Sequence, residues 1–521
     1  MENQDSIIDK ILTWSSGKTG SGKSFDELFT IDGISVGWFF KKLFLPGVIP
    51  KNLDVYKLIQ KKQGLSLAQR TRFAVTAKAL RKIIMFNEKK KFAKCKKKEN
   101  VSVGSKSKKN VLFLTFNNFI SKDGSNFRIQ EVIDELKKKK GFQEKILYAS
   151  PLSARFSKDF AALPTIYQYY DSEIEAKAKN ISSALYKQWQ ELDSKTREEF
   201  VQLEGKSLWP FMKYLFDFYV SKEFFFLLAA YFEIAKKIIN EDKITLVILT
   251  SPNSLIERCF VAAAKLRSVP CIVIQHGVGL SRLIDFSCPV HYAVFGEQTK
   301  KKVLDAGAPS DYLHVTGPVV FDQAHHYKAK VQKDSKALLV VTGPYVEDNN
   351  LPKKVYFERM SKILAKIASI PNHTIILKLH PREKHKDEYE KILKEHNIRH
   401  ASFFDNNAPR EKFYEAIAQC KSFVSFGSTA SIEAMIIGKP IVTINPTDTF
   451  DIVSLLEDAT INVYYYEDIK AAIERSFLDE KTYRKKREKY LEKYCGLVDG
   501  KASERVVKLV LHLTQTPSSN R

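Results

Sequence analysis

Cysteine is scarce in this chain and follows no recognisable spacing. The six cysteines are scattered, and none forms a C-x-x-C pair: Cys95, Cys259, Cys271, Cys288, Cys420 and Cys495. Scattered thiols of this kind fit a reducing cytosol and argue against both a disulfide framework and a clustered zinc site. We therefore expect a cytoplasmic protein without a metal site.

A long hydrophobic run is also absent. The longest apolar stretch, FFFLLAAYFEIA from Phe224, is too short to span a bilayer, and the polar, acidic N-terminus does not resemble a secretory leader. Hydrophobic residues still make up 44% of the 521 residues, and aromatic residues 12%. These fractions argue against disorder and predict two or three globular domains, soluble or peripheral on the inner face of the cell membrane.

Acidic residues are too few to balance the basic ones, which leaves a formal net charge of +24. Much of the excess lies in lysine-rich tracts, and the segment from Lys89 to Asn110 is predicted to be a linker. An anionic membrane surface or an anionic substrate suits this charge, and solvated helix faces are the plainer alternative. Because the chain lacks interleaved aromatic and basic residues that would stack on bases, nucleic acid is a disfavoured partner.

The segment SSGKTGSGKS, Ser15 to Ser24, matches the phosphate-binding P-loop pattern from Gly17 to Ser24. A working P-loop needs a buried strand before it and a helix after it. Here the preceding residues repeat at helical spacing, and the following segment is broken at Asp32-Gly33. We predict a turn between two short helices, with a P-loop NTPase as the less favoured alternative.

The pattern of the chain changes after a mostly helical N-terminal extension with its linker, residues 1–109. Beyond it, short apolar runs alternate with helical segments, which is typical of parallel sheets covered on both faces. The sequence predicts an α/β fold of two tandem doubly wound, Rossmann-like domains, 110–330 and 331–485, followed by a C-terminal helix and tail, 486–521. The expected strands span 110–116, 144–150, 244–251, 270–277, 290–296, 336–343, 373–381, 421–428 and 439–446.

Gln275-His276-Gly277 directly follows one of these strands. Gly277 would let the chain turn sharply and present His276 at the carboxyl edge of the sheet, where open α/β sheets bind ligands. An imidazole, with an unperturbed pKa of about 6.5, can act there as a general base. The alternative is a histidine that only caps the following turn.

KLHPRE follows a strand of the second half and concentrates donors at its end: Lys378, His380, Pro381 and Arg382. Several positive or N–H groups around one strand end suit a phosphate, and the proline suits the first turn of a helix. The alternative is a basic corner of the surface without a ligand.

SFGSTASIEA places Gly427, Ser428 and Thr429 between a strand and a helix N-terminus. Hydroxyl and N–H groups at such a position form a ready anion site. Glu433 lies on the first turns of that helix, where its carboxylate can accept both hydroxyls of a ribose. It would otherwise merely favour the helix dipole.

Taken in order, QHG, LHP and GSTASIEAMIIGKPIV resemble the GT-B glycosyltransferase superfamily over residues 110 to the C-terminus. The resemblance is greatest to capsule and surface-polysaccharide transferases, including polysialyltransferase-like and CDP-glycerol glycerophosphotransferase-like enzymes. The chain lacks the D/E-D/E-G motif of the sialyltransferase kind. It also shows no signature of the UDP-GlcNAc 2-epimerases, which share the fold.

The resemblance implies a GT-B glycosyltransferase that moves a sugar from a nucleotide-activated donor to a glycan or lipid-linked acceptor in surface polysaccharide synthesis. A polyol-phosphate transferase of the CDP-glycerol type is the alternative. His380, Ser428 and Thr429 would bind the donor phosphates, Glu433 the ribose, and His276 would be the base. Fixed dipoles and cations would stabilise the leaving group, so the nucleotide sugar is the substrate and neither a cofactor nor a metal is expected.

Overall fold

The computed structural model of the chain describes the following residues: 19, 22, 24–39, 67–95, 108–121, 124–152, 154–200, 202–203, 206–207, 209–252, 254–277, 290–305, 307–332, 334–348, 350–426, 428–445 and 456–515. Of the P-loop pattern, Gly17 and Lys23 lie outside this set. Ser24 lies within it and is buried. It caps the four-residue helix α2 (Phe25–Leu28) and exchanges hydrogen bonds with Glu27.

The first half is built on a six-stranded, all-parallel sheet in the order β10-β9-β8-β7-β3-β4. Its side chains alternate between two apolar layers because successive strand residues point to opposite faces. Val111 and Phe113 pack on one side, and Leu112 and Leu114 on the other. The strands are β3 (Lys109–Phe116), β4 (Phe142–Ala149), β7 (Ile244–Leu249), β8 (Cys271–Ile274), β9 (His291–Val294) and β10 (Leu313–Val315).

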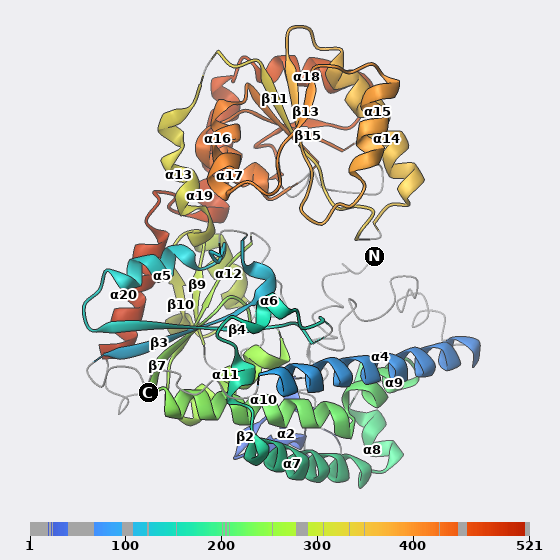
Figure 1. Cartoon of the computed structure of the whole chain (residues 1–521), viewed down its shortest axis with the longest axis vertical. Helices are drawn as coiled ribbons and strands as arrows, with labels where there is room; N and C mark the ends of the chain where they lie inside the picture. The colour runs from blue at the N-terminus through green and yellow to red at the C-terminus, as the bar shows by residue number, and fades with distance from the viewer. Residues whose placement is uncertain are drawn as a thin grey trace.

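Helices cover both faces of this sheet (Figure 1). The helices of this half are α5 (Gln130–Lys137), α6 (Lys158–Ala161), α7 (Ser172–Gln190), α8 (Ser194–Glu199), α9 (Trp209–Tyr219), α10 (Lys222–Glu241), α11 (Leu255–Leu266) and α12 (Glu297–Asp305). The next helix, α13 (Asp322–His326), packs on the second half. The N-terminal helix α4 (Leu67–Lys94) lies beside α10, where the Phe92 and Tyr231 rings meet. Two small antiparallel hairpins complete this half: β1 (Thr30–Ile31) with β2 (Ile34–Ser35), and β5 (Gln202–Leu203) with β6 (Lys206–Ser207).

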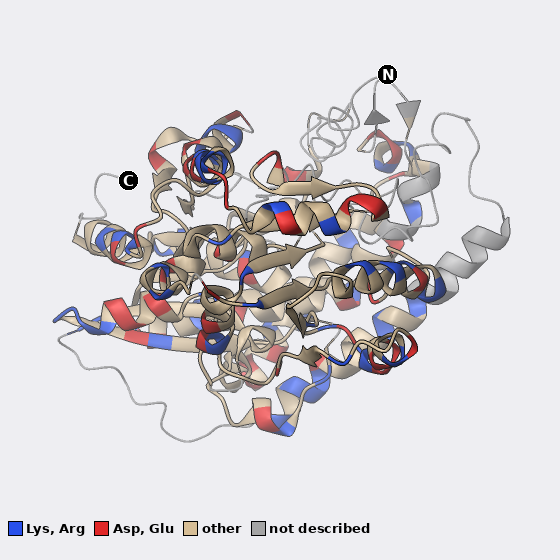
Figure 2. Ribbon diagram, turned by 90° about the horizontal axis from the view of Figure 1, so that it is seen from above, with Lys and Arg blue, Asp and Glu red and all other residues tan. Residues whose placement is uncertain are grey.

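The second half repeats the plan with a parallel sheet in the order β13-β12-β11-β14-β15-β16. Its strands are β11 (Ala337–Val341), β12 (Thr374–Lys378), β13 (Ala401–Phe403), β14 (Ser422–Ser425), β15 (Ile441–Ile444) and β16 (Ile461–Val463). Its helices are α14 (Lys353–Ala368), α15 (Lys386–Glu395), α16 (Arg410–Gln419), α17 (Ala430–Ile437), α18 (Ile469–Ser476) and α19 (Lys481–Cys495). Figure 2 shows that most charged residues lie on helices, as expected for buried parallel strands.

The last helix, α20 (Ala502–Gln515), returns to the first half and packs beside α5 (Figure 1). The chain therefore crosses between the halves twice, and the second crossing touches both the first crossing and the end of β9. A Cβ built on Gly317 in the first crossing would lie 2.8 Å from the Leu497 carbonyl oxygen. A Cβ built on Gly496 would lie 2.6 Å from the Phe295 carbonyl oxygen, and one on Gly296 would lie 2.8 Å from the Gly496 nitrogen. Two tandem doubly wound sheets joined in this way confirm the predicted fold class, with a GT-B-like arrangement.

The structure differs from the sequence expectation at the sheet edges and in the linker. The three-residue strands β10, β13 and β16 were not predicted, because each is too short to show a periodic pattern. Lys89–Lys94, expected in the linker, form the last turns of α4. Among the described residues no helix is long and apolar enough to cross a membrane, and FFFLLAAYFEIA forms the buried part of α10.

Gly496→Ala tests the contact between the second crossing and the end of β9. Gly496 has φ of 66°, and alanine there would both enter a strained region and press on Phe295, so we expect a loss of about 2 kcal/mol or more in unfolding free energy. Gly141→Ala is the matched control, since Gly141 has φ of 83° but nothing within 4 Å of a Cβ. Thermal unfolding of both variants checks this: equal losses would show that the crossing contact carries no energetic weight.

Candidate active site between the two halves

His276 follows β8 at the carboxyl edge of the first sheet, with its ring open to solvent on one side. Its Nδ1 lies 2.8 Å from the Thr250 carbonyl oxygen. A carbonyl can only accept, so Nδ1 carries the proton and Nε2 is left as the acceptor of the neutral ring. Burial lowers the pKa of His276 to about 4, and the Arg128 cation acts in the same direction. The imidazole is therefore neutral near pH 7, as a general base must be.

Gln275 and Gly277, which flank His276 in the sequence, have structural roles. Gln275 is buried, and its amide donates to the Gly277 carbonyl and accepts from the Phe295 N–H, each at 2.7 Å. It thereby ties the end of β8 to the end of β9. Gly277 does not adopt a positive φ, and a Cβ there would meet nothing within 4 Å. The chain bends at Gly277 as expected, but in a conformation that does not require a glycine.

His380 follows β12 at the carboxyl edge of the second sheet. Its backbone N–H donates to the Glu383 carboxylate at 2.6 Å and to the Thr342 hydroxyl at 3.2 Å. Glu383 also accepts from Thr342 and from the Tyr389 hydroxyl, and burial raises the pKa of its carboxyl group. This network fixes the loop against the end of β11. Burial, together with the cations Arg382 and Lys378, lowers the pKa of His380 to about 4.

The side chains of the other residues predicted in this loop lie in different surroundings. Arg382 forms a two-pronged ion pair with Asp348, at 2.5 and 3.0 Å, with its side chain 60% exposed. Pro381 is exposed. Lys378 turns toward α16 and lies 4.7 Å from the centre of the Phe413 ring. Burial lowers the pKa of its ammonium group, and the Glu433 carboxylate opposes that shift. Lys378 thus belongs with Glu433 rather than with Arg382.

The loop after β14 leads into α17. Gly427 lies outside the described residues. Ser428 is half-buried and accepts from the Ala430 N–H at 3.2 Å, while its own N–H donates to Ser425 at 3.3 Å. Thr429 stands at the N-cap position of α17 and is exposed, and no described residue accepts from its backbone N–H. An N–H group and the positive end of a helix dipole therefore remain open to an anion.

Glu433 is buried on α17, and one of its oxygens is held by two side chains of α16. Arg410 donates to Oε1 at 2.6 Å, and the Tyr414 hydroxyl donates to it at 3.1 Å. Burial lowers the pKa of Arg410, but the Glu433 carboxylate and Tyr414 raise it above its ordinary value overall. The second oxygen, Oε2, has no hydrogen-bond partner among the described residues.

A cavity of about 470 Å³ is lined by both halves of the molecule. Arg410 and Tyr414 line it from the second half, and Phe127 and Arg128 from the loop after β3. The Arg128 guanidinium lies 3.5 Å from the centre of the Phe119 ring, and burial lowers its pKa to about 10, which Glu257 opposes. Because Arg128 also lowers the pKa of His276, it links this cavity electrostatically to the end of β8.

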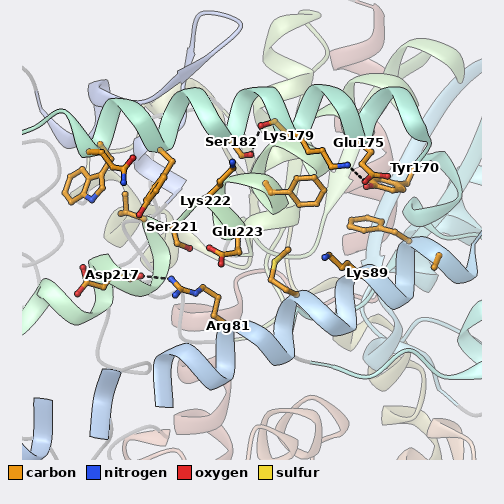
Figure 3. Close-up of a pocket in the computed structure, with 18 of the residues that line it drawn as sticks. Arg81, Lys89, Tyr170, Glu175, Lys179, Ser182, Asp217, Ser221, Lys222 and Glu223 are labelled. Carbon is orange, nitrogen blue, oxygen red and sulfur yellow. Dashed lines mark hydrogen bonds and ion pairs between the residues drawn. The ribbon is translucent and has the colours of Figure 1, made fainter. Parts of the chain in front are cut away.

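A second and larger cavity, of about 1370 Å³, lies away from the strand ends. It is a groove between α4, α7 and the α9–α10 corner (Figure 3). The rings of Phe92 and Tyr170 stack in it with their centres 4.1 Å apart. Trp189, which also lines the groove, stacks on Phe216. Arg81 donates to the Asp217 carbonyl at 2.9 Å across one end. Neither His276 nor His380 lines this groove, and both follow strand ends.

The structure therefore adds five residues to the site that the sequence reading did not single out: Thr342, Glu383, Arg410, Tyr414 and Arg128. Thr342 and Glu383 lie in the strand-end segments that the sequence points to, so a search for buried partners of His380 would have found them. Arg410 and Tyr414 start a helix that follows an unpredicted strand, and no local signal marks them.

Residues 282–511 match the family model described as UDP-N-acetylglucosamine 2-epimerase, which is less than half of the chain. The matched part runs from β9 through the whole second sheet to α20. The expectation that the sequence carries no signature of this family is therefore wrong. No curated protein matches the chain significantly in sequence.

Solved structures with similar folds include two UDP-GlcNAc 2-epimerases. The enzyme of Neisseria meningitidis, bound to UDP-GlcNAc, is 14% identical, with a TM-score of 0.47 over 77% of this chain and 100% of that one. The enzyme of Methanocaldococcus jannaschii is 13% identical, with a TM-score of 0.47 over 77% and 99%. A lipopolysaccharide outer core galactosyltransferase is 10% identical, with a TM-score of 0.42 over 77% and 99%.

The titration of His276 tests the electrostatics of the first half. The ring should keep its neutral form down to about pH 4, because burial and Arg128 both disfavour the imidazolium. In histidine-labelled protein, the NMR signal that disappears in His276→Gln should titrate near pH 4. Arg128→Gln should raise that midpoint part of the way toward about 6.5. The exposed Arg267→Gln should leave it unchanged. A wild-type midpoint at or above 6.5 would contradict the assignment.

Proposed function

We propose that the chain is a glycosyltransferase that uses a nucleotide-activated sugar and transfers the sugar to an acceptor hydroxyl. The observation that carries this is Glu433, a buried carboxylate with one oxygen held by Arg410 and Tyr414 and the other without a partner among the described residues. A carboxylate fixed in this way at the carboxyl edge of a doubly wound sheet suits the vicinal hydroxyls of a ribose. The match of residues 282–511 to a nucleotide-sugar enzyme family supports the same substrate class.

The donor phosphates would lie between the Ser428–Thr429 loop and His380. The open Thr429 N–H and the N-terminal dipole of α17 stabilise negative charge without having to reorganise. Neutral His380 can donate a hydrogen bond, and its loop is held rigid by Glu383. Lys378, coupled to Glu433, supplies a further positive charge on the α16 side. Arg382 is neutralised by Asp348 and is not assigned a phosphate.

The acceptor would approach from the first half. His276 Nε2 takes the proton of the acceptor hydroxyl as its oxygen forms the bond to the sugar carbon, and the bond from that carbon to the nucleotide phosphate breaks. A transferase must also hold a second substrate, and the groove between α4 and α7 offers aromatic and polar groups on the first half for this purpose. A glycan or a lipid-linked glycan suits such a mixed lining.

A 2-epimerase is the second candidate, favoured by the family-model match alone. Both reactions break the bond between the sugar and the nucleotide, so the donor side of the site would serve either of them. They differ in what happens next: an epimerase inverts the substituent at C2 and needs no acceptor.

Glu433→Gln tests the donor site. The substitution removes the negative charge that a ribose hydroxyl would meet, so it should weaken nucleotide binding at least about tenfold. Thermal shift with UDP, CMP, CDP, GDP and ADP measures this, and the nucleotide that raises the wild-type midpoint also names the donor base. Glu411→Gln is the control, since Glu411 follows Arg410 on α16 and lines the cavity between the halves, with no hydrogen bond to Glu433. Equal shifts in all three proteins would remove Glu433 from the site.

The products formed from UDP-GlcNAc in deuterated water separate the two candidate reactions. A transferase should release UDP faster when an acceptor glycan is added and should leave the C2 proton in place, because its chemistry is confined to C1. An epimerase should incorporate deuterium at C2 and form the inverted sugar without any acceptor. Mass spectrometry and NMR of the sugar distinguish these outcomes, and deuterium at C2 would replace the transferase proposal with the epimerase.

A further inference from the structure

Helix α4, 28 residues long, presents two unlike faces. Its inner face packs on the first half through buried Ile84 and Phe92. Glu88 and Lys91, both fully buried, form an ion pair of 2.6 Å on this face, and Glu88 also accepts from the Tyr231 hydroxyl. Since a buried ion pair needs all its partners, the rotation of α4 about its axis is fixed.

The outer face carries three large hydrophobic residues in the open. Leu80 is 40% exposed, Ile83 54% and Phe86 67%. Successive members are three residues apart and are therefore neighbours on the helix surface, and we call them the α4 apolar row. Large side chains are usually scattered singly over a soluble surface, so a row of three on one helix indicates a contact.

The charged side chains that α4 itself exposes have one sign. Five lysines of this helix are exposed: Lys78, Lys82, Lys89, Lys90 and Lys94. The helix contains a single carboxylate, Glu88, and that group is buried and paired with Lys91. The outer face therefore offers aliphatic and aromatic groups within a ring of positive charge that no acidic residue of the helix offsets.

We propose that the α4 apolar row docks the protein on an anionic lipid bilayer, with the helix lying in the plane of the interface. Apolar side chains that enter the acyl boundary, flanked by lysines that meet anionic headgroups, are the pattern of an interfacial helix. A second copy of the chain suits the face poorly, because its lysines would oppose lysines. Nucleic acid would satisfy the lysines but leave the apolar row in water.

Docking through this face would also place the larger cavity beside the membrane. Arg81 and Lys89 extend from α4 into that cavity (Figure 3). Lys89 comes only three residues after Phe86, so the mouth of the groove and the α4 apolar row adjoin on the same helix. The inference does not depend on the proposed reaction, since it rests on the surface of α4 alone.

Vesicle flotation of the full chain tests the inference. The wild type should float with vesicles of phosphatidylcholine and phosphatidylglycerol and remain unbound with phosphatidylcholine alone. Leu80→Gln/Ile83→Gln/Phe86→Gln should reduce binding to the anionic vesicles at least about tenfold. Lys82→Gln/Lys90→Gln should reduce it about fivefold for each lysine.

The control is Leu478→Gln/Leu497→Gln. These two leucines are 71% and 62% exposed and lie far from α4 in the sequence, so flotation should be unchanged. All variants should keep the wild-type melting point, because none of these side chains is buried. Undiminished flotation of the triple variant would overturn the proposal. So would a concentration-dependent dimer that the triple variant abolishes, or displacement of the protein from vesicles by RNA regardless of the apolar row.

Discussion

Arg410 makes the interaction on which the geometry of the site depends. From the first turn of α16 it donates to the carbonyl of Phe127 at 3.1 Å, to that of Val320 at 3.2 Å and to Glu433 at 2.6 Å. One guanidinium thus joins the loop after β3, the crossing between the halves and the helix that carries the candidate ribose ligand. A planar fork with several donors can satisfy all three, which a lysine could not.

The two crossings hold the halves in the position that this arginine needs. Asp322 in the first crossing accepts from the N–H groups of Ala502 and Ser503 at 3.0 and 2.7 Å, which caps α20 from a distant part of the chain. Arg505 of α20 makes a second contact with the first crossing by donating to the Thr316 carbonyl at 2.6 Å. The crossings meet at Gly317, where a Cβ would lie 2.8 Å from the Leu497 carbonyl oxygen, and Gly496 of the second crossing lies against Gly296 at the end of β9. Sequence neighbours alone would not bring these groups together.

Part of the candidate site follows from the sequence, because chain direction fixes where loops meet. In a parallel sheet all carboxyl ends lie on one edge, so His380 and the Ser428 loop had to flank the end of β11. The side chains that hold them did not follow in the same way. Arg410 reaches Glu433 only because α16 packs against α17, and Arg128 reaches His276 only because the loop after β3 folds over the first sheet.

The sequence by itself determined the central strands, the helices between them and the tandem α/β plan, because burial on both faces imposes continuous apolar runs that can be read locally. Tertiary structure decided the three short edge strands, which are stabilised by a neighbour and not by their own pattern. It also decided the roles of the charged residues: Arg382 pairs with Asp348, while Arg410 enters the site. Charge pairing depends on distances across the fold, and a linear sequence does not contain them.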